Sequence, residues 1–192
     1  MSFNVHIETL ELDDFDFSER ELAAYPSDQA GDVEMTGIGS VDLMQIHGCW
    51  HQKYEGKTFG ELVPRAHGDG DETEKRILGA LKRGPDRLAY LHRNPSYYIG
   101  EEVKTPPWSF EWIDGRLYIT AGMHRSVIGL YFLAANGLST VVHGVTVTHM
   151  RGTGSAPVEP SAPNDASTPT QSAQSSWAAR LSAALGRTRR DR

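Results

Sequence analysis

The residues best suited to chemistry in this chain form the short sequence Gly122-Met-His-Arg-Ser126. Glycine lets a backbone approach a ligand closely, and the side chains of His124 and Arg125 are donors that suit phosphate oxygens. The first N–H groups of a helix are unpaired, and the helix dipole is positive at that end. If a helix begins here, the sequence predicts a phosphate site made by Gly122, Met123, His124, Arg125 and Ser126.

The flanking sequence supplies the elements that would position this turn. Residues 117–120 are β-formers that predict a buried strand, and residues 126–135 predict a helix that ends at Asn136-Gly137. Residues 139–148 then fit a further strand. A solvated helix cap also explains the His-Arg pair, but this arrangement favours a site at the carboxyl end of the first strand, where α/β folds usually place functional atoms.

The segment from Thr105 to Ser126, which opens with a Pro-Pro pair, resembles the core of the ParB/sulfiredoxin superfamily. In that family a proline-containing segment, two strands and a Gly-X-(His/Arg)-Arg turn bind nucleotide phosphates. Gly122, His124 and Arg125 match this turn, and the similarity covers roughly residues 95–150. It implies a compact α/β domain with a small mixed sheet, flanking helices and, in this chain, a disordered C-terminal tail.

Two departures from the family pattern narrow what the resemblance implies. Sulfiredoxins carry their catalytic cysteine at the position of Met123, and a thioether cannot act as a thiolate nucleophile, so sulfinic-acid reduction is not expected. The chain also lacks the second arginine of chromosome-partitioning ParB proteins and shows no helix-turn-helix pattern downstream. In length and motif it is more similar to plasmid-encoded fertility-inhibition and oncogenic-suppression proteins.

The resemblance to those proteins implies ATP hydrolysis and metal-dependent DNA cleavage. Arg125 would clamp phosphate and His124 would transfer a proton, with ATP or another nucleoside triphosphate and Mg²⁺ or a similar divalent cation as cofactors. Such chemistry needs a carboxylate to hold the metal or to orient the attacking water. Asp114 and Gly115 are a typical hairpin-turn pair, so Asp114 is expected to form a turn and Glu102 is the preferred carboxylate. The chain has no P-loop Gly-Lys-Ser/Thr, so ATP chemistry would have to use the Gly-X-His-Arg turn.

The same resemblance implies a biological setting and its partners. The protein would block conjugative or T-DNA transfer through type IV secretion, with nucleotide, DNA and a secretion coupling protein as partners. The alternative is a non-catalytic adaptor that senses a nucleotide and inhibits the coupling protein by binding it. The net charge of −6 of this chain argues against broad nonspecific DNA binding, so DNA contact would need a local basic patch.

Charge divides the chain into an acidic head, a neutral centre and a basic tail. Residues 1–34 hold ten carboxylates and one arginine, residues 35–150 hold twelve charges of each sign, and residues 151–192 hold six arginines and three carboxylates. We therefore expect a partly docked acidic arm, a central ParB/sulfiredoxin-like domain, a disordered linker over 151–176 and a short basic amphipathic tail over 177–192.

Composition indicates a soluble cytoplasmic protein. Of the 192 residues, 39% are hydrophobic, which is enough for one core. No run of eighteen apolar residues is present and the N-terminus lacks signal-peptide character, so no membrane insertion is expected. The single cysteine, Cys49, excludes an intramolecular disulfide and fits a reducing compartment.

Two predicted helices carry the best basic surface of the central region. They span about Glu74–Leu81 and Asp86–Arg93. Their basic side chains could line the phosphate site or guide a DNA strand, or they could be a solvated outer face. These residues are Lys75, Arg76, Lys82, Arg83, Arg87 and Arg93.

A short cluster of His47, Cys49 and His51 suggests zinc. A closed structural zinc site needs four ligands, however, and no second Cys/His pair lies at a suitable spacing. We expect instead that Cys49 and Trp50 are buried.

Overall fold

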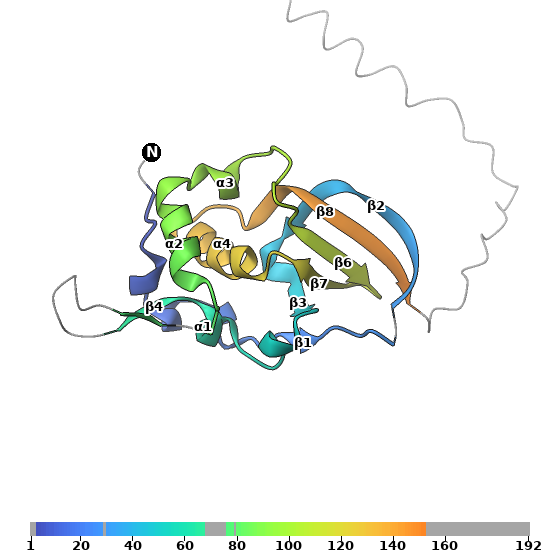
Figure 1. Ribbon diagram of the computed structural model, residues 1–192, viewed down its shortest axis with the longest axis horizontal. Helices are drawn as coiled ribbons and strands as arrows, with labels where there is room; N and C mark the ends of the chain where they lie inside the picture. The colour runs from blue at the N-terminus through green and yellow to red at the C-terminus, as the bar shows by residue number, and fades with distance from the viewer. Residues whose placement is uncertain (1–2, 29, 68–75, 79, 153–192) are drawn as a thin grey trace, which may run out of the picture. The chain divides into compact units, whose positions relative to one another are not determined.

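The computed structural model describes residues 3–28, 30–67, 76–78 and 80–152, and its centre is a six-stranded mixed sheet (Figure 1). In chain order the strands of this sheet are β1 (Ala23–Ala24), β2 (Ala30–Asp42), β3 (Ile46–Cys49), β6 (Ser109–Ile113), β7 (Arg116–Ala121) and β8 (Val141–Gly152). Their spatial order is β1-β3-β7-β6-β8-β2. The predicted α/β class with a small mixed sheet is confirmed, and the predicted linker and tail lie almost wholly outside the described residues.

The pairing within the sheet brings two strand ends together. β3 runs parallel to β7, with Cys49 opposite Ile119, so both strands finish at one edge of the sheet. β6 and β7 form an antiparallel hairpin whose turn residues, Asp114 and Gly115, have φ values of 48° and 74°. Positive φ at both central positions is typical of a type I′ turn, as the Asp-Gly pair predicts. β8 pairs parallel with β6 and antiparallel with β2.

The helices are short apart from two. They are α1 (Phe59–Leu62), α2 (Gly84–Arg93), α3 (Ser96–Ile99) and α4 (Met123–Ala135), together with 3₁₀ turns η1 (Ile7–Thr9), η2 (Leu12–Asp14), η3 (Asp16–Glu19), η4 (Leu43–Gln45) and η5 (Gln52–Tyr54). α4 is buried on almost its whole circumference from Val127 to Leu133, and α2 packs against it. The strands and helix predicted around the Gly-X-His-Arg turn are therefore present as β7, α4 and β8.

One predicted helix is wrong where the structure describes it. Within the expected helix 74–81, Arg76–Leu78 forms strand β5, which pairs antiparallel with β4 (Arg65–His67). A short segment gains little from helix propensity alone, so pairing with a distant strand decides its conformation. The second expected helix is confirmed as α2, which begins two residues earlier with Pro85 in its first turn.

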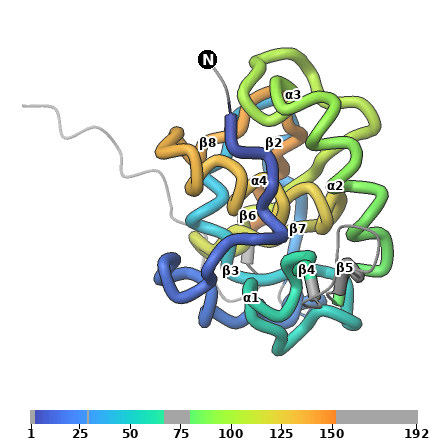
Figure 2. Tube along the Cα trace, turned by 90° about the vertical axis from the view of Figure 1, so that its left-hand side faces the viewer, coloured from blue at the N-terminus to red at the C-terminus, as the bar shows by residue number. Residues whose placement is uncertain are grey.

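The N-terminal segment belongs to the core despite its acidity. Ile7 is fully buried and Phe17 is 7% exposed. The Ser18 hydroxyl lies 2.8 Å from the hydroxyl of Tyr131 on α4, and the ring of Phe17 packs edge-on against Tyr131. Figure 2 shows this segment crossing the outer side of α4, so residues 3–20 cover the central helix.

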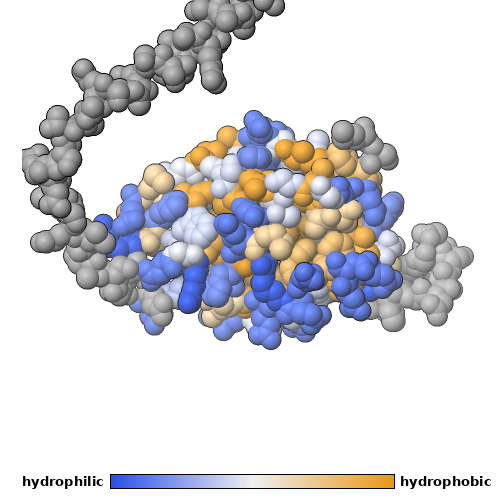
Figure 3. Space-filling model, turned by 180° about the vertical axis from the view of Figure 1, so that it is seen from behind, coloured by the Kyte–Doolittle hydropathy of each residue, from blue (hydrophilic) through white to orange (hydrophobic). Residues whose placement is uncertain are grey.

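The described surface mixes polar and apolar side chains (Figure 3). The edge strand β2 contributes three exposed apolar residues, Val33, Met35 and Ile38, each more than half exposed. Among the described residues, no helix is long and apolar enough to cross a membrane.

Candidate anion-binding site

The Gly-X-His-Arg turn connects β7 to α4, and Gly122 is the residue that makes the connection possible. Gly122 has a φ of 91° and is the N-cap of α4. A Cβ atom at this position would lie 2.4 Å from Cδ1 of the buried Trp108. Only glycine satisfies both the left-handed backbone and this close approach, so the turn can form only with glycine here.

A cavity of about 300 Å³ lies at the carboxyl ends of β3 and β7, beside the start of α4. It is lined by Cys49, His51, Arg87 and the continuous segment 119–125. Among these described lining residues there are basic side chains and no carboxylate. The cavity therefore has the composition of an anion site.

The pKa of His124 reflects the burial and the positive charges around this cavity. The backbone N–H of Arg83 donates to Nε2 of His124 at 3.4 Å, which leaves the proton of the neutral ring on Nδ1. Burial, followed by the positive charges of Arg87, Arg83, His51 and Lys53, lowers the pKa of His124 below 6.5. A bound anion would offset this repulsion and favour the protonated ring.

The backbone at the start of α4 supplies further donors. The amides of Met123, His124 and Arg125 occupy the first turn, where a helix offers no carbonyl partner. The Ser126 amide instead donates to Gly122 O at 2.9 Å and so closes the first helical turn. The amides of Met123, His124 and Arg125 are therefore free of helical hydrogen bonds and available to a ligand, whereas that of Ser126 is not.

The Ser126 side chain is also committed to the fold. Ser126 is fully buried; its hydroxyl accepts from Trp108 Nε1 at 2.9 Å and lies 3.2 Å from Gly122 O. The residue thereby fixes Trp108 beneath Gly122. This places Ser126 behind the turn, where it positions the cavity wall.

Arg125 is held by protein acceptors. Its Nη1 donates to the Tyr97 hydroxyl at 2.6 Å and to Pro106 O at 2.7 Å, and its Nη2 donates to Pro107 O at 2.5 Å. Arg125 is only 7% exposed, and its guanidinium lies over the Trp108 ring. A phosphate clamp at this side chain would require these hydrogen bonds to break, so Arg125 is better suited to position the turn than to bind the ligand.

Glu102 lies away from the cavity. It sits in the exposed loop between α3 and β6, where its carbonyl oxygen would be 2.0 Å from a Cβ built on Gly144 of β8. The structure thus does not bring Glu102 together with His124 and Arg125. A divalent cation such as Mg²⁺ prefers carboxylate oxygens, which the described lining lacks, so the residues present do not fit that ion.

A second hollow of about 680 Å³ adjoins the first and shares His51 and Thr120 with it. Its remaining lining residues are Trp50, Gln52 and Lys53. Trp50 is 58% exposed, so the expectation of a buried indole is wrong. The ring stacks on Tyr25 with centroids 5.5 Å apart and an interplanar angle of 20°, which leaves an aromatic surface at the rim.

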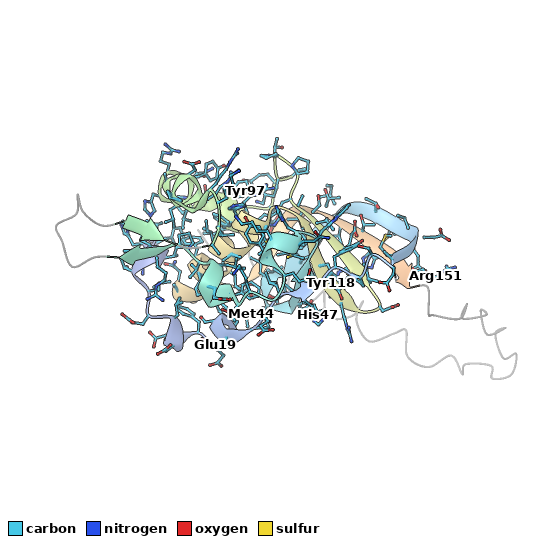
Figure 4. The ribbon with its side chains drawn as sticks, turned by 60° about the horizontal axis from the view of Figure 1, so that its bottom comes forward. Glu19, Met44, His47, Tyr97, Tyr118 and Arg151 are labelled. Carbon is cyan, nitrogen blue, oxygen red and sulfur yellow. The ribbon has the colours of Figure 1, made fainter. Side chains whose placement is uncertain are left out.

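The expected burial of Cys49 is confirmed, at 1% exposure. Burial raises the pKa of its thiol, whose Sγ lies 3.6 Å from the carbonyl oxygen of His51. His47 packs instead against Tyr118 of the neighbouring strand, with perpendicular rings and centroids 5.5 Å apart (Figure 4). Within the described part of the chain, His47, Cys49 and His51 do not form a metal-binding group.

Sequence reasoning missed the contribution of Trp50, His51 and Lys53 to this region. It did include Arg87, though only as one of six basic residues. The missing signal was the parallel pairing of β3 with β7, because parallel strands place whatever follows them at the same edge. Comparisons of the chain with protein-family models, curated proteins and solved structures found no match.

Replacing Arg125 by methionine should destabilise the fold. The substitution Arg125→Met leaves two backbone carbonyls and the Tyr97 hydroxyl without their donor, and we expect a loss of about 3 kcal/mol in the free energy of unfolding. Urea unfolding followed by circular dichroism measures this loss. Arg87→Met, at a partly exposed position on the cavity wall, is the matched control and should cost less than about 1 kcal/mol. Equal effects of the two substitutions would contradict the positioning role of Arg125.

The lowered pKa of His124 predicts a pH dependence of stability. As the pH falls below 6.5, the unfolded chain takes up a proton at this position before the folded protein does. The stability associated with neutral His124 is therefore present above about pH 6.5 and is lost as the pH falls toward the folded-state pKa. His124→Gln should reduce the drop in urea midpoint between pH 7 and pH 5. An unchanged drop in His124→Gln would refute the assignment.

Proposed function

We propose that this protein binds a nucleoside triphosphate, with the phosphate chain in the cavity at the start of α4. The observation that carries the proposal is the basic, carboxylate-free lining next to a helix N-terminus in a cavity of about 300 Å³. Amide donors and a positive helix end suit phosphate oxygens. The match of Gly122, His124 and Arg125 to the phosphate-binding turn of the ParB/sulfiredoxin superfamily supports the same ligand class.

Each group in the cavity has a distinct task in this proposal. The amides of residues 123–125 hydrogen-bond the phosphate oxygens, and Arg87 supplies a fixed charge. His124 gains a proton as the ligand binds, because the anion offsets its cationic neighbours. Arg125 holds the turn in place through Pro106 and Pro107.

The adjoining hollow suits the nucleoside part of the ligand. The exposed ring of Trp50, backed by Tyr25, offers a flat surface on which a base can stack. His51 and Thr120 line both hollows, so a ligand with phosphate in one and base in the other would be continuous. A nucleotide fits this pair of hollows better than inorganic phosphate does.

The biological setting we propose rests on the resemblance to fertility-inhibition and oncogenic-suppression proteins. The protein would inhibit conjugative or T-DNA transfer by binding a type IV secretion coupling protein in a nucleotide-dependent way. ATP hydrolysis and DNA cleavage are the second candidate, supported by the half-buried His124, whose lowered pKa suits a general base. The described lining offers no carboxylate for a metal or a water, which favours the binding protein over the enzyme.

Removal of the Arg87 charge should weaken nucleotide binding. We expect Arg87→Ala to raise the Kd for ATP about tenfold, measured by isothermal titration calorimetry, since one charge-assisted hydrogen bond is lost. Arg93→Ala is the matched control, because Arg93 lies on the same helix and outside the cavity lining. Absence of ATP binding in the wild-type protein, or equal effects of the two substitutions, would overturn the proposal.

Trp50 should determine the preference for a nucleotide over bare phosphate. Trp50→Leu removes the stacking surface, so the Kd for ATP should rise about tenfold while the Kd for tripolyphosphate stays constant. The ratio of the two constants, from calorimetry, isolates the base contribution. A parallel rise in both constants would place the base elsewhere.

Turnover assays on the same proteins separate the two candidate functions. ATP that binds without release of phosphate, together with intact plasmid DNA, identifies a binding protein. Phosphate release or DNA cleavage that Arg87→Ala abolishes and Arg93→Ala retains would identify the enzyme.

A further inference from the structure

Three residues outside the cavity lining bring metal-binding atoms together. His6 and Glu8 lie on the N-terminal segment, and His92 lies in the last turn of α2. Their ligand atoms all lie within 4.8 Å of one another. His6 Nδ1 is 3.1 Å from one carboxylate oxygen of Glu8, and His92 Nε2 is 3.7 Å from the other.

Glu8 is the unusual member of this group. Its side chain is only 10% exposed, and its Oε2 atom has no hydrogen-bond partner in the described part of the chain. A buried carboxylate oxygen without a partner is costly, and native structures rarely keep one. The oxygen faces His92 at a distance too long for a hydrogen bond and suited to an intervening ion.

We infer that His6, Glu8 and His92 bind one divalent transition-metal ion, with Zn²⁺ as the best fit. Zn²⁺ takes imidazole nitrogen and carboxylate oxygen at about 2.0–2.1 Å, which separates the ligand atoms of a tetrahedral site by about 3.4 Å. The distance from His6 Nδ1 to one carboxylate oxygen, 3.1 Å, and that from His92 Nε2 to the other, 3.7 Å, lie on either side of this value, and all the ligand atoms lie within 4.8 Å, so small movements of the two exposed rings would complete the site. Mg²⁺ and Ca²⁺ prefer oxygen ligands alone, so two imidazoles exclude them.

The exposure of the histidines fits an open coordination site. The side chains of His6 and His92 are 64% and 32% exposed, so both rings can adjust and solvent can reach the metal. Three protein ligands leave the fourth tetrahedral position to water. The site therefore has the ligand count of an open zinc site and lacks the fourth protein ligand of a closed structural one.

The metal would tie the N-terminal segment to α2. Asn136 already holds this segment at Asn4 through two hydrogen bonds, of 2.7 and 2.8 Å, at the end of α4. A metal bound by His6, Glu8 and His92 would add a second attachment on the neighbouring helix. The inference does not depend on the proposed nucleotide function, since none of its ligands lines the cavity.

Titration of chelator-treated full-length protein tests the site. Competition with a chromophoric chelator should show one equivalent of Zn²⁺ bound, and the Kd should rise at least 10–100-fold in His6→Ala and in His92→Ala. Glu8→Gln keeps the shape of the side chain and should fold, yet it should weaken Zn²⁺ by a similar factor. Excess Zn²⁺ at about 100 times the Kd should raise the Tm of the wild type by about 5–10 °C, and Mg²⁺ should not.

Substitutions at other candidate ligands serve as controls. His51→Ala and Cys49→Ser should leave the Kd for Zn²⁺ unchanged. Co²⁺ bound in place of Zn²⁺ reports coordination number through its visible absorption, which should disappear in His92→Ala. Zn²⁺ binding that survives His6→Ala and His92→Ala, or that is lost in Cys49→Ser, would overturn the inference, as would wild-type protein that takes up no Zn²⁺.

Discussion

The candidate site depends on the hydrogen bonds by which Arg125, at the start of α4, holds Pro106 and Pro107. A buried guanidinium needs acceptors for its donors, and the carbonyls of Pro106 and Pro107 with the Tyr97 hydroxyl supply them. These acceptors fix the segment before β6 against the start of α4. Trp108, the next residue, then lies under Gly122 and is held there by Ser126. The residues of the predicted phosphate site thus divide into those that build the turn and those that face the cavity.

This division changes which side chains are expected to touch a ligand. The sequence predicts phosphate contact by Arg125 and Ser126, yet Ser126 is fully buried and the guanidinium of Arg125 is held by protein acceptors. Outside the turn, Arg87 on α2 supplies a positive charge to the cavity wall, and His51 from the segment after β3 adds an imidazole ring. Because the first amides of α4 border the same space, backbone groups and a side chain distant in sequence supply donors there, where the sequence led us to expect the side chain of Arg125.

The sequence allowed the central part of the fold to be predicted because its signals are local. The β-formers in 117–120, the Asp114-Gly115 pair and the apolar helix before Asn136 each depend on neighbouring residues, and all three predictions are confirmed. The segment 76–78 was misjudged because its strand exists only through pairing with β4. Similarly, the exposure of Trp50 depends on where β3 ends relative to β7 and on the position of Tyr25, and neither is encoded near Trp50.

α2 connects the two candidate sites, and its structure limits how they can influence each other. Its first half brings Arg87 to the cavity and its last turn bears His92, five residues later, which is about 7.5 Å along the helix axis. Leu88 and Leu91 on the same helix are buried, and α2 packs against α4. Any coupling would therefore act through the packing of α2 against α4. A metal bound at one end of α2 would reduce local unfolding at the other end. Such coupling is reciprocal, so a ligand in the cavity would tighten the metal site by the same factor.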